Sequence, residues 1–90
     1  MKTFNLQPID GRKTMDKHHV NQYEDNGQTI SDLISYTSKV ASYNHATNYM
    51  LVYNVPRGLS NTTLRHIKAF FHFYGFDVPT KQELKKTYNL

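Results

Sequence analysis

The side chains most able to do chemistry in this sequence are five histidines, and their spacing limits what they can do. His66 and His72 are six residues apart in a predicted helix, whereas two helical metal ligands need to be three or four residues apart. His18 and His19 are neighbours in a predicted extended segment, so they face opposite ways. His45 stands alone in a predicted loop. Because the chain also has no cysteine, we expect no metal site and no cofactor.

Motifs for hydrolytic or transfer catalysis are missing too. The sequence has no Gly-rich phosphate loop, no Gly-x-Ser-x-Gly motif and no paired acidic residues in an obvious cleft. His66 remains a candidate acid or base, with Asp32 or Asp77 as its partner, because catalytic partners meet in space rather than in sequence. The alternative is a structural His66 whose ring hydrogen-bonds a neighbouring strand or loop. We favour the structural role and expect a protein that is not an enzyme.

The element that positions His66 is the clearest in the chain, residues 60–75. Ser60 is suited to cap a helix and Gly75 to end it. Between them the apolar residues recur at helical spacing and share one face, namely Leu64, Ile67, Phe70, Phe71 and Tyr74. The sequence therefore predicts a helix from about Asn61 to Tyr74, packed on an apolar strand that includes Leu51 and Tyr53 or Tyr49.

The opposite edge of this helix is basic and is the best candidate for a binding surface. The expected partner- or phosphate-binding residues are Arg65, Lys68, His72, Asn61 and Thr62. Hydroxyl groups in a first helical turn can satisfy local backbone groups, or they can cradle a phosphate or a partner carboxylate with Arg65 one turn on. Both interpretations stay open from the sequence.

Four hydrogen-bonding residues at the helix start are more than one cap needs. We therefore expect a structural polar junction between the helix and the segment Ser35-Tyr36-Thr37. Its members are predicted to be Ser60, Thr63, His66 and Tyr36, with His66 mostly buried and hydrogen-bonded near that segment.

The rest of the chain predicts an antiparallel sheet. Asn26-Gly27 is a strong hairpin signal, because both residues of a type I′ turn need positive φ. The strand after it is expected to run from Gln28 to about Tyr43 as one long strand, bent near Thr37-Ser38. After a loop, residues 49–54 form an apolar run that suggests the central strand, ended by Pro56.

The last residues predict a second helix. Thr80 and Glu83 match a capping box, and the helix is expected to continue to about Tyr88. The predicted fold class is α+β, an antiparallel sheet of three or four strands packed by two C-terminal helices. Residues 1–90 are expected to form a single small domain in which residues 1–16 are an arm or an edge strand.

Composition narrows the class of protein. Eleven Lys and Arg against seven Asp and Glu give a formal charge of +4 and a pI near 9.4, which favours attraction to nucleic acid or to an acidic protein surface. No apolar run approaches the roughly 20 residues of a membrane span, and the start lacks the apolar stretch of a secretory signal. We therefore expect a soluble, cytoplasmic protein that does not contact a membrane.

Two strings in the sequence resemble a family of short, uncharacterised proteins from bacteriophages and other mobile elements. The first is a Ser-Tyr-x-Thr-x-Val-Ala strand, seen here from Ser35 to Ala41 with Ser38 at the Thr position. The second is a Ser-x-Thr-Thr-x-Arg-His-Ile helix start, from Ser60 to Ile67. The opening segment from Phe4 to Lys13 is also similar to some members. The resemblance implies a phage protein that acts on host or phage nucleic-acid machinery.

Two functions from different classes follow from these observations. The first is a small non-enzymatic phage-type effector that binds and inhibits an acidic host protein or ribonucleoprotein acting on nucleic acid, an anti-CRISPR-like inhibitor of host defence. The alternative is a small basic DNA- or RNA-binding module that regulates phage genes, with Arg65, Lys68 and His72 on the phosphates. In either case the expected location is the host cell cytoplasm.

Overall fold

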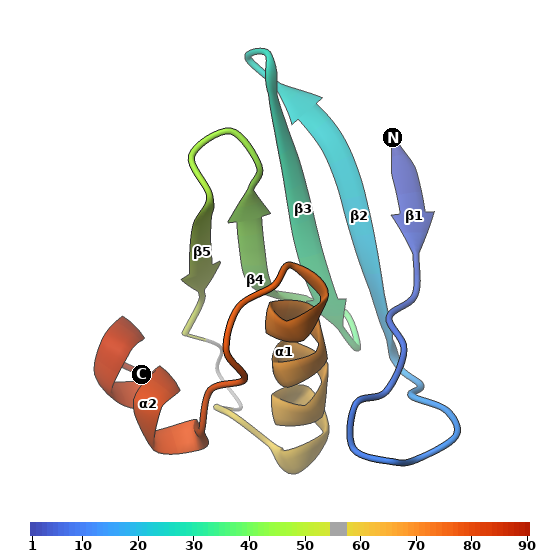
Figure 1. Cartoon of the computed structure of the whole chain (residues 1–90), viewed down its shortest axis with the longest axis vertical. Coiled ribbons are helices and arrows are strands. Elements are labelled where there is room, and N and C mark those ends of the chain that lie inside the picture. The colour runs from blue at the N-terminus through green and yellow to red at the C-terminus, as the bar shows by residue number, and fades with distance from the viewer. Residues whose placement is uncertain (55–57) are drawn as a thin grey trace.

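A computed structural model describes residues 1–54 and 58–90 as a five-stranded sheet with two helices (Figure 1). The strands and helices are, in chain order, β1 Lys2–Phe4, β2 His18–Asp25, β3 Gln28–Ser35, β4 Ser38–Asn44, β5 Tyr49–Val52, α1 Asn61–Phe73 and α2 Lys81–Tyr88. This is the predicted α+β class. Pro56, the predicted end of the last strand, lies outside the described residues.

The strands lie in the sheet in their chain order, from β1 to β5, and each pairs antiparallel with the next. The predicted number of three or four strands is wrong, because the expected long strand is two strands. β3 and β4 meet in a tight turn in which Ser35 pairs with Ser38. Tyr36 takes a positive φ of 58° in this turn, and its N–H donates to the Lys17 carbonyl oxygen at 2.7 Å.

The apolar strand β5 is at the edge of the sheet, not at its centre as predicted. Met50 and Val52 are buried while Tyr49 is exposed, so β5 alternates like a strand with one covered face. The central strand is β3. The turn at Asn26-Gly27 is confirmed, since both residues have positive φ and join β2 to β3.

Helix α1 begins and ends close to the predicted residues. Ser60 is its N-cap and its hydroxyl oxygen accepts a hydrogen bond from the Thr63 N–H at 3.2 Å. The helix lies in front of the sheet and contacts β3 and β4 (Figure 1). The predicted contact with Leu51 and Tyr53 or Tyr49 is wrong, because β5 points its alternate residues, Met50 and Val52, into the core.

The core between α1 and the sheet is made of large apolar side chains from every part of the chain. The most deeply buried are Val20, Leu33, Ile67, Phe70 and Leu84. Aromatic rings extend this core toward the end of α1, where Tyr74 stacks on Tyr43 with ring centroids 4.4 Å apart.

Helix α2 lies beside the lower end of β5 (Figure 1). The predicted capping box is present, because Thr80 and Glu83 each bond the other's backbone N–H. Leu84 packs into the core, and the Tyr88 hydroxyl donates to the Met50 carbonyl oxygen at 2.8 Å. Within residues 1–54 and 58–90, neither helix has the length and apolar character needed to cross a membrane.

Candidate functional site

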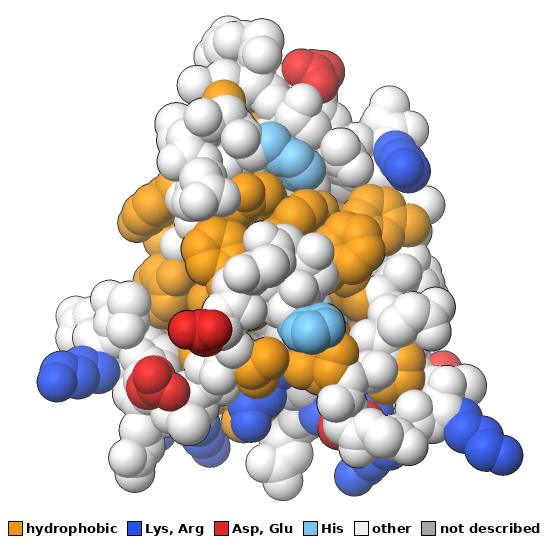
Figure 2. Space-filling model, viewed as in Figure 1, with side chains coloured by type: hydrophobic (Ala, Val, Ile, Leu, Met, Phe, Trp, Pro, Cys, Tyr) orange, Lys and Arg blue, Asp and Glu red, His pale blue; other side chains and the backbone are white. Residues whose placement is uncertain are grey.

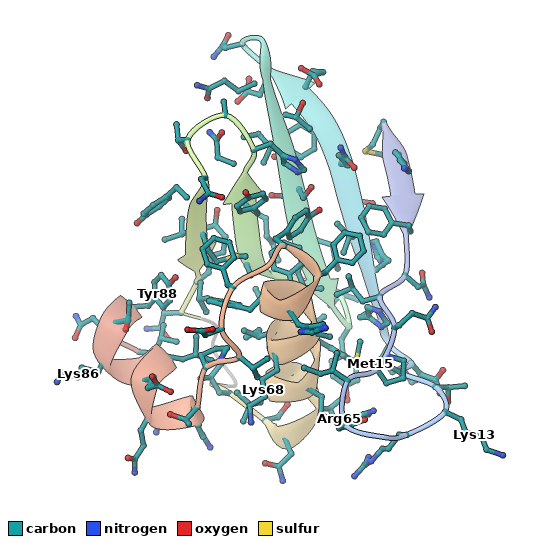
Figure 3. All side chains as sticks on the ribbon, in the orientation of Figure 1. Lys13, Met15, Arg65, Lys68, Lys86 and Tyr88 are labelled. Atoms are coloured by element: carbon teal, nitrogen blue, oxygen red, sulfur yellow. The ribbon has the colours of Figure 1, made fainter. Side chains whose placement is uncertain are left out.

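Basic side chains gather at one end of the molecule. Figure 2 shows Lys and Arg mainly along the lower end, beneath a band of hydrophobic side chains. Lys13, Arg65, Lys68 and Lys86 are all in the lower part of Figure 3. They come from the loop between β1 and β2, from the first turns of α1 and from α2, so three separate segments build this basic end.

A groove opens at this end between the loop and α1. The loop contributes Asp10 and Arg12, and the helix contributes the remaining lining residues Asn61, Thr62, Leu64, Arg65 and Lys68. Four of the five residues predicted to bind a partner or a phosphate therefore line one groove. The fifth, His72, is exposed about one turn beyond Lys68 and is not among the residues that line the groove.

Arg65, predicted as a binding residue, already has a charged partner within the protein. Its guanidinium donates through Nε to Asp10 Oδ2 and through Nη2 to Asp10 Oδ1 at 3.4 Å. The same Nη2 lies 3.4 Å from the Thr14 carbonyl oxygen. The hydrogen bond and charge of Arg65 lower the pKa of Asp10. Arg65 therefore ties the loop to the helix. Arg12 Nε also lies 3.8 Å from Asp10 Oδ2, but its side chain is 69% exposed, so Arg12 and Lys68 are the more available cations of the groove.

The junction between α1 and the β3–β4 turn is a buried chain of hydrogen bonds. Ser35 Oγ lies 2.8 Å from His66 Nδ1 and 3.0 Å from Thr63 Oγ1. His66 Nε2 lies 2.8 Å from the Asp16 carbonyl oxygen. His66 is fully buried, which confirms that it is buried and hydrogen-bonded near this turn.

The hydrogen-bond partners of His66 determine which atoms of this network carry the protons. A carbonyl oxygen only accepts, so Nε2 carries the proton and donates it to Asp16, and Nδ1 of the neutral ring accepts from Ser35. The Ser35 oxygen then accepts from the Thr63 hydroxyl. The side chains of Thr63, Ser35 and His66 are therefore all hydrogen-bonded, and this network joins the helix, the sheet and the loop.

Two predicted members of the junction are not part of this chain. Ser60 caps the helix instead. Tyr36 is exposed, with its ring centroid 6.3 Å from that of His66, and only its backbone N–H is bonded to the loop. Ser35, predicted only as part of the segment that the junction would contact, is the residue at its centre.

A serine hydroxyl bonded to a histidine ring also suits a nucleophile and its base. Here both side chains are inside the protein, with Ser35 2% exposed and His66 0% exposed, so no substrate reaches them. Burial lowers the pKa of His66 to about 4, which makes the ring a weak base at neutral pH. The carboxylates of Asp32 and Asp77 do not bond to it either. The geometry therefore suits a structural role.

His18 packs on His66, with ring centroids 4.9 Å apart. Its Nε2 accepts a hydrogen bond from the Leu6 N–H at 2.9 Å, so the proton of the neutral ring is on Nδ1. That buried Nδ1 has no hydrogen-bond partner among the described residues. Burial lowers the pKa of His18 as well. Two neutral rings thus fill the space between the loop and α1.

A second polar cluster lies on the opposite face of the sheet and was missed in the sequence. Asp32 points there because the residues on either side of it are in the core. Its carboxylate accepts from the Tyr23 hydroxyl at 2.8 Å and from Ser42, and it lies 3.7 Å from Lys39 Nζ. The Tyr53 hydroxyl donates to Ser42 at 3.2 Å. Only the cross-strand register brings these residues together.

The bond from Tyr23 to Asp32 has a measurable consequence. The hydrogen bond favours the protonated phenol, and with burial and the carboxylate charge it raises the pKa of Tyr23 to about 12. Replacing Asp32 with alanine should therefore bring the Tyr23 pKa down toward its usual value of about 10, which spectroscopic titration of the tyrosines measures. An unchanged titration would show that this bond does not form in solution.

A resident metal ion would need several ligand side chains in one place. No group of three or more His, Asp or Glu side chains meets this requirement in the part of the chain that the structure describes.

Comparison with known proteins gives a family match over most of the chain. The model of a family of unknown function, DUF8033, matches residues 4–86, which include the groove, the junction and the Asp32 cluster. No curated protein and no solved structure matches the sequence. The chain belongs to the DUF8033 family.

Proposed function

We propose that this chain is a small non-enzymatic effector of phage type, which binds and inhibits a host protein or ribonucleoprotein that acts on nucleic acid. The observation that carries the proposal is the groove at the basic end. The groove is lined by four of the residues that the sequence predicts to bind a partner, and by Arg12 from a distant segment. The four are Asn61, Thr62, Arg65 and Lys68. A groove with several cations is suited to an acidic surface of a partner.

The rigid support of the groove favours a binding role. Its helix is capped by Ser60 and fixed to the sheet through the buried bonds of His66. The loop on its other side is fixed to the same helix by Arg65. A preformed surface loses little conformational entropy when a partner binds. The similarity of the two sequence strings to short phage proteins supports a host target for that surface.

Reversing the charge of the groove should remove partner binding without unfolding the protein. Arg12 and Lys68 are the positions to change, because Arg65 also holds the loop through Asp10 and Thr14. We expect the double variant Arg12→Glu with Lys68→Glu to lose the host partner that wild type captures from a lysate of the cell that carries the gene. Arg12 is exposed and Lys68 is partly exposed, and surface charges contribute about 0–1 kcal/mol each to stability, so the melting temperature should stay close to that of wild type.

A matched control has the same change of net charge outside the groove. Lys2→Glu with Lys81→Glu changes two exposed cations that do not line it. This control should capture the partner as wild type does. Equal capture by both double variants would mean that the groove is not the binding surface.

The alternative is a DNA- or RNA-binding module, and the gathering of basic residues at one end supports it. Contact with several phosphates releases counterions, so binding to random DNA or RNA would weaken steeply between 50 and 200 mM salt. An inhibitor of a host protein has no need to bind free nucleic acid. Tight, salt-sensitive binding of purified protein to random DNA or RNA would favour the alternative.

A further inference from the structure

The groove contains an acidic residue that already holds its central cation. Asp10 and Arg65 are 55 positions apart in the sequence, and two guanidinium nitrogens of Arg65 face the two carboxylate oxygens of Asp10. This side-on arrangement is the geometry in which arginine recognises a carboxylate. The Arg65 side chain is 22% exposed and that of Asp10 is 34% exposed, so solvent and a partner can reach the pair.

We propose that Asp10 pairs with Arg65 in the free protein, at the position that a ligand carboxylate takes in the complex. The ligand is a carboxylate side chain from an acidic segment of a protein partner. The inference rests on the proposed function and names the group that the partner supplies. The incoming carboxylate replaces Asp10 on Arg65, while Arg12 and Lys68, which line the same groove, attract the neighbouring acidic residues of the segment.

Displacement of Asp10 does not require the loop to unfold. The loop is also fixed by a hydrogen bond from the Leu6 N–H to His18 at 2.9 Å and by one from His66 to the Asp16 carbonyl oxygen at 2.8 Å. Met15, in the same loop, is only 6% exposed. Asp10 also keeps other partners when it leaves Arg65, because its Oδ1 accepts from the Arg12 N–H at 3.2 Å and its Oδ2 lies 3.8 Å from Arg12 Nε.

The same residue argues against a nucleic-acid backbone as the ligand. A displaced Asp10 stays in the groove as a negative charge, and it would repel a continuous row of phosphates. In a protein segment, by contrast, single carboxylates are separated by neutral groups, and some of these groups can donate a hydrogen bond to Asp10. The mixed charge of the groove therefore suits an acidic protein segment better than DNA or RNA.

The test is a titration of uniformly ¹⁵N-labelled protein with a hexaglutamate peptide, followed by NMR at the Arg65 Nε–H signal. Asp10→Asn removes the competing charge, so we expect this variant to bind the peptide about two- to five-fold more tightly than wild type. Asp16→Asn is the matched control, because it makes the same charge change in the same loop outside the groove. The control should bind as wild type does.

Several results would overturn the inference. One is an Asp10→Asn variant that binds the peptide no better than Asp16→Asn, and another is binding that leaves the Arg65 signal unmoved. A parallel titration with a twelve-nucleotide DNA strand completes the test. If Asp10→Asn gains more affinity for the DNA than for the peptide, the groove is a phosphate site instead.

Failure here is distinct from failure of the proposed function. If the peptide does not bind but capture of a host protein still depends on Arg12 and Lys68, the effector role stands and the carboxylate assignment is wrong. If no host protein depends on the groove, the effector role itself is wrong.

Discussion

Replacing Phe70 with alanine is expected to destabilise the protein by about 3–5 kcal/mol, the largest effect of any single truncation in the core. Phe70 is completely buried between α1 and the sheet, and its ring meets that of Tyr74 edge-on with centroids 5.2 Å apart. A small domain has a total stability of about 5–15 kcal/mol, so the variant should lose a large part of it. In a thermal melt its midpoint should fall by at least about 12 °C.

Phe73 provides the matched control for this prediction. It lies three residues further along α1 but is 54% exposed, with its ring next to those of Phe4 and Tyr74 at the surface. Its replacement by alanine removes the same atoms and should cost about 1 kcal/mol or less, as is usual at exposed sites. Equal losses at both positions would contradict the packing of α1 described above.

Acidification should destabilise the protein through His66. In the unfolded chain the ring titrates near 6.5, whereas burial keeps the folded pKa at about 4, with the nearby His18 opposing a positive charge as well. Above pH 6.5 both states are neutral and stability is unaffected. Between pH 6.5 and about 4 the unfolded chain binds a proton at this histidine, whereas the folded protein does not. The free energy of unfolding should therefore fall by about 3 kcal/mol in total.

Denaturant unfolding at a series of pH values measures this loss. Carboxylates such as Asp10 and Glu83, whose pKa values are lowered, add their own acid dependence, so variants must be compared with wild type. His66→Gln should be less stable at pH 7 but should lose less stability on acidification. His72→Gln, which changes an exposed residue of the same helix, should follow the wild-type curve. A His66→Gln curve parallel to wild type would contradict the buried neutral ring.

Local signals in the sequence were enough to predict the helices and the first hairpin. Ser60, the capping box at Thr80 and the Asn26-Gly27 turn each act through their own neighbours, so their effects can be read without knowing the fold. The burial of His66 could also be predicted, because the helix start has more polar groups than one cap can use.

Features that depend on contacts between distant residues could not be predicted. The turn between β3 and β4 has no glycine, and Tyr36 adopts its positive φ where the backbone is bonded to Lys17, a partner that only the fold supplies. The ion pair between Arg65 and Asp10 likewise joins segments with no local relation. Arg65, which the sequence predicts as a binding residue, is therefore partly a structural residue. The available positive charge of the groove is mainly that of Arg12 and Lys68.

The central claim is that the basic end binds a host protein directly, and affinity purification with and without nuclease tests it most directly. Tagged wild-type protein is purified from the cell that carries the gene, with half of the lysate treated with DNase and RNase, and the bound proteins are quantified by mass spectrometry. We expect one enriched host protein in both halves that is absent with the Arg12→Glu and Lys68→Glu double variant. Enrichment that disappears after nuclease treatment, or that survives the charge reversal, would contradict it.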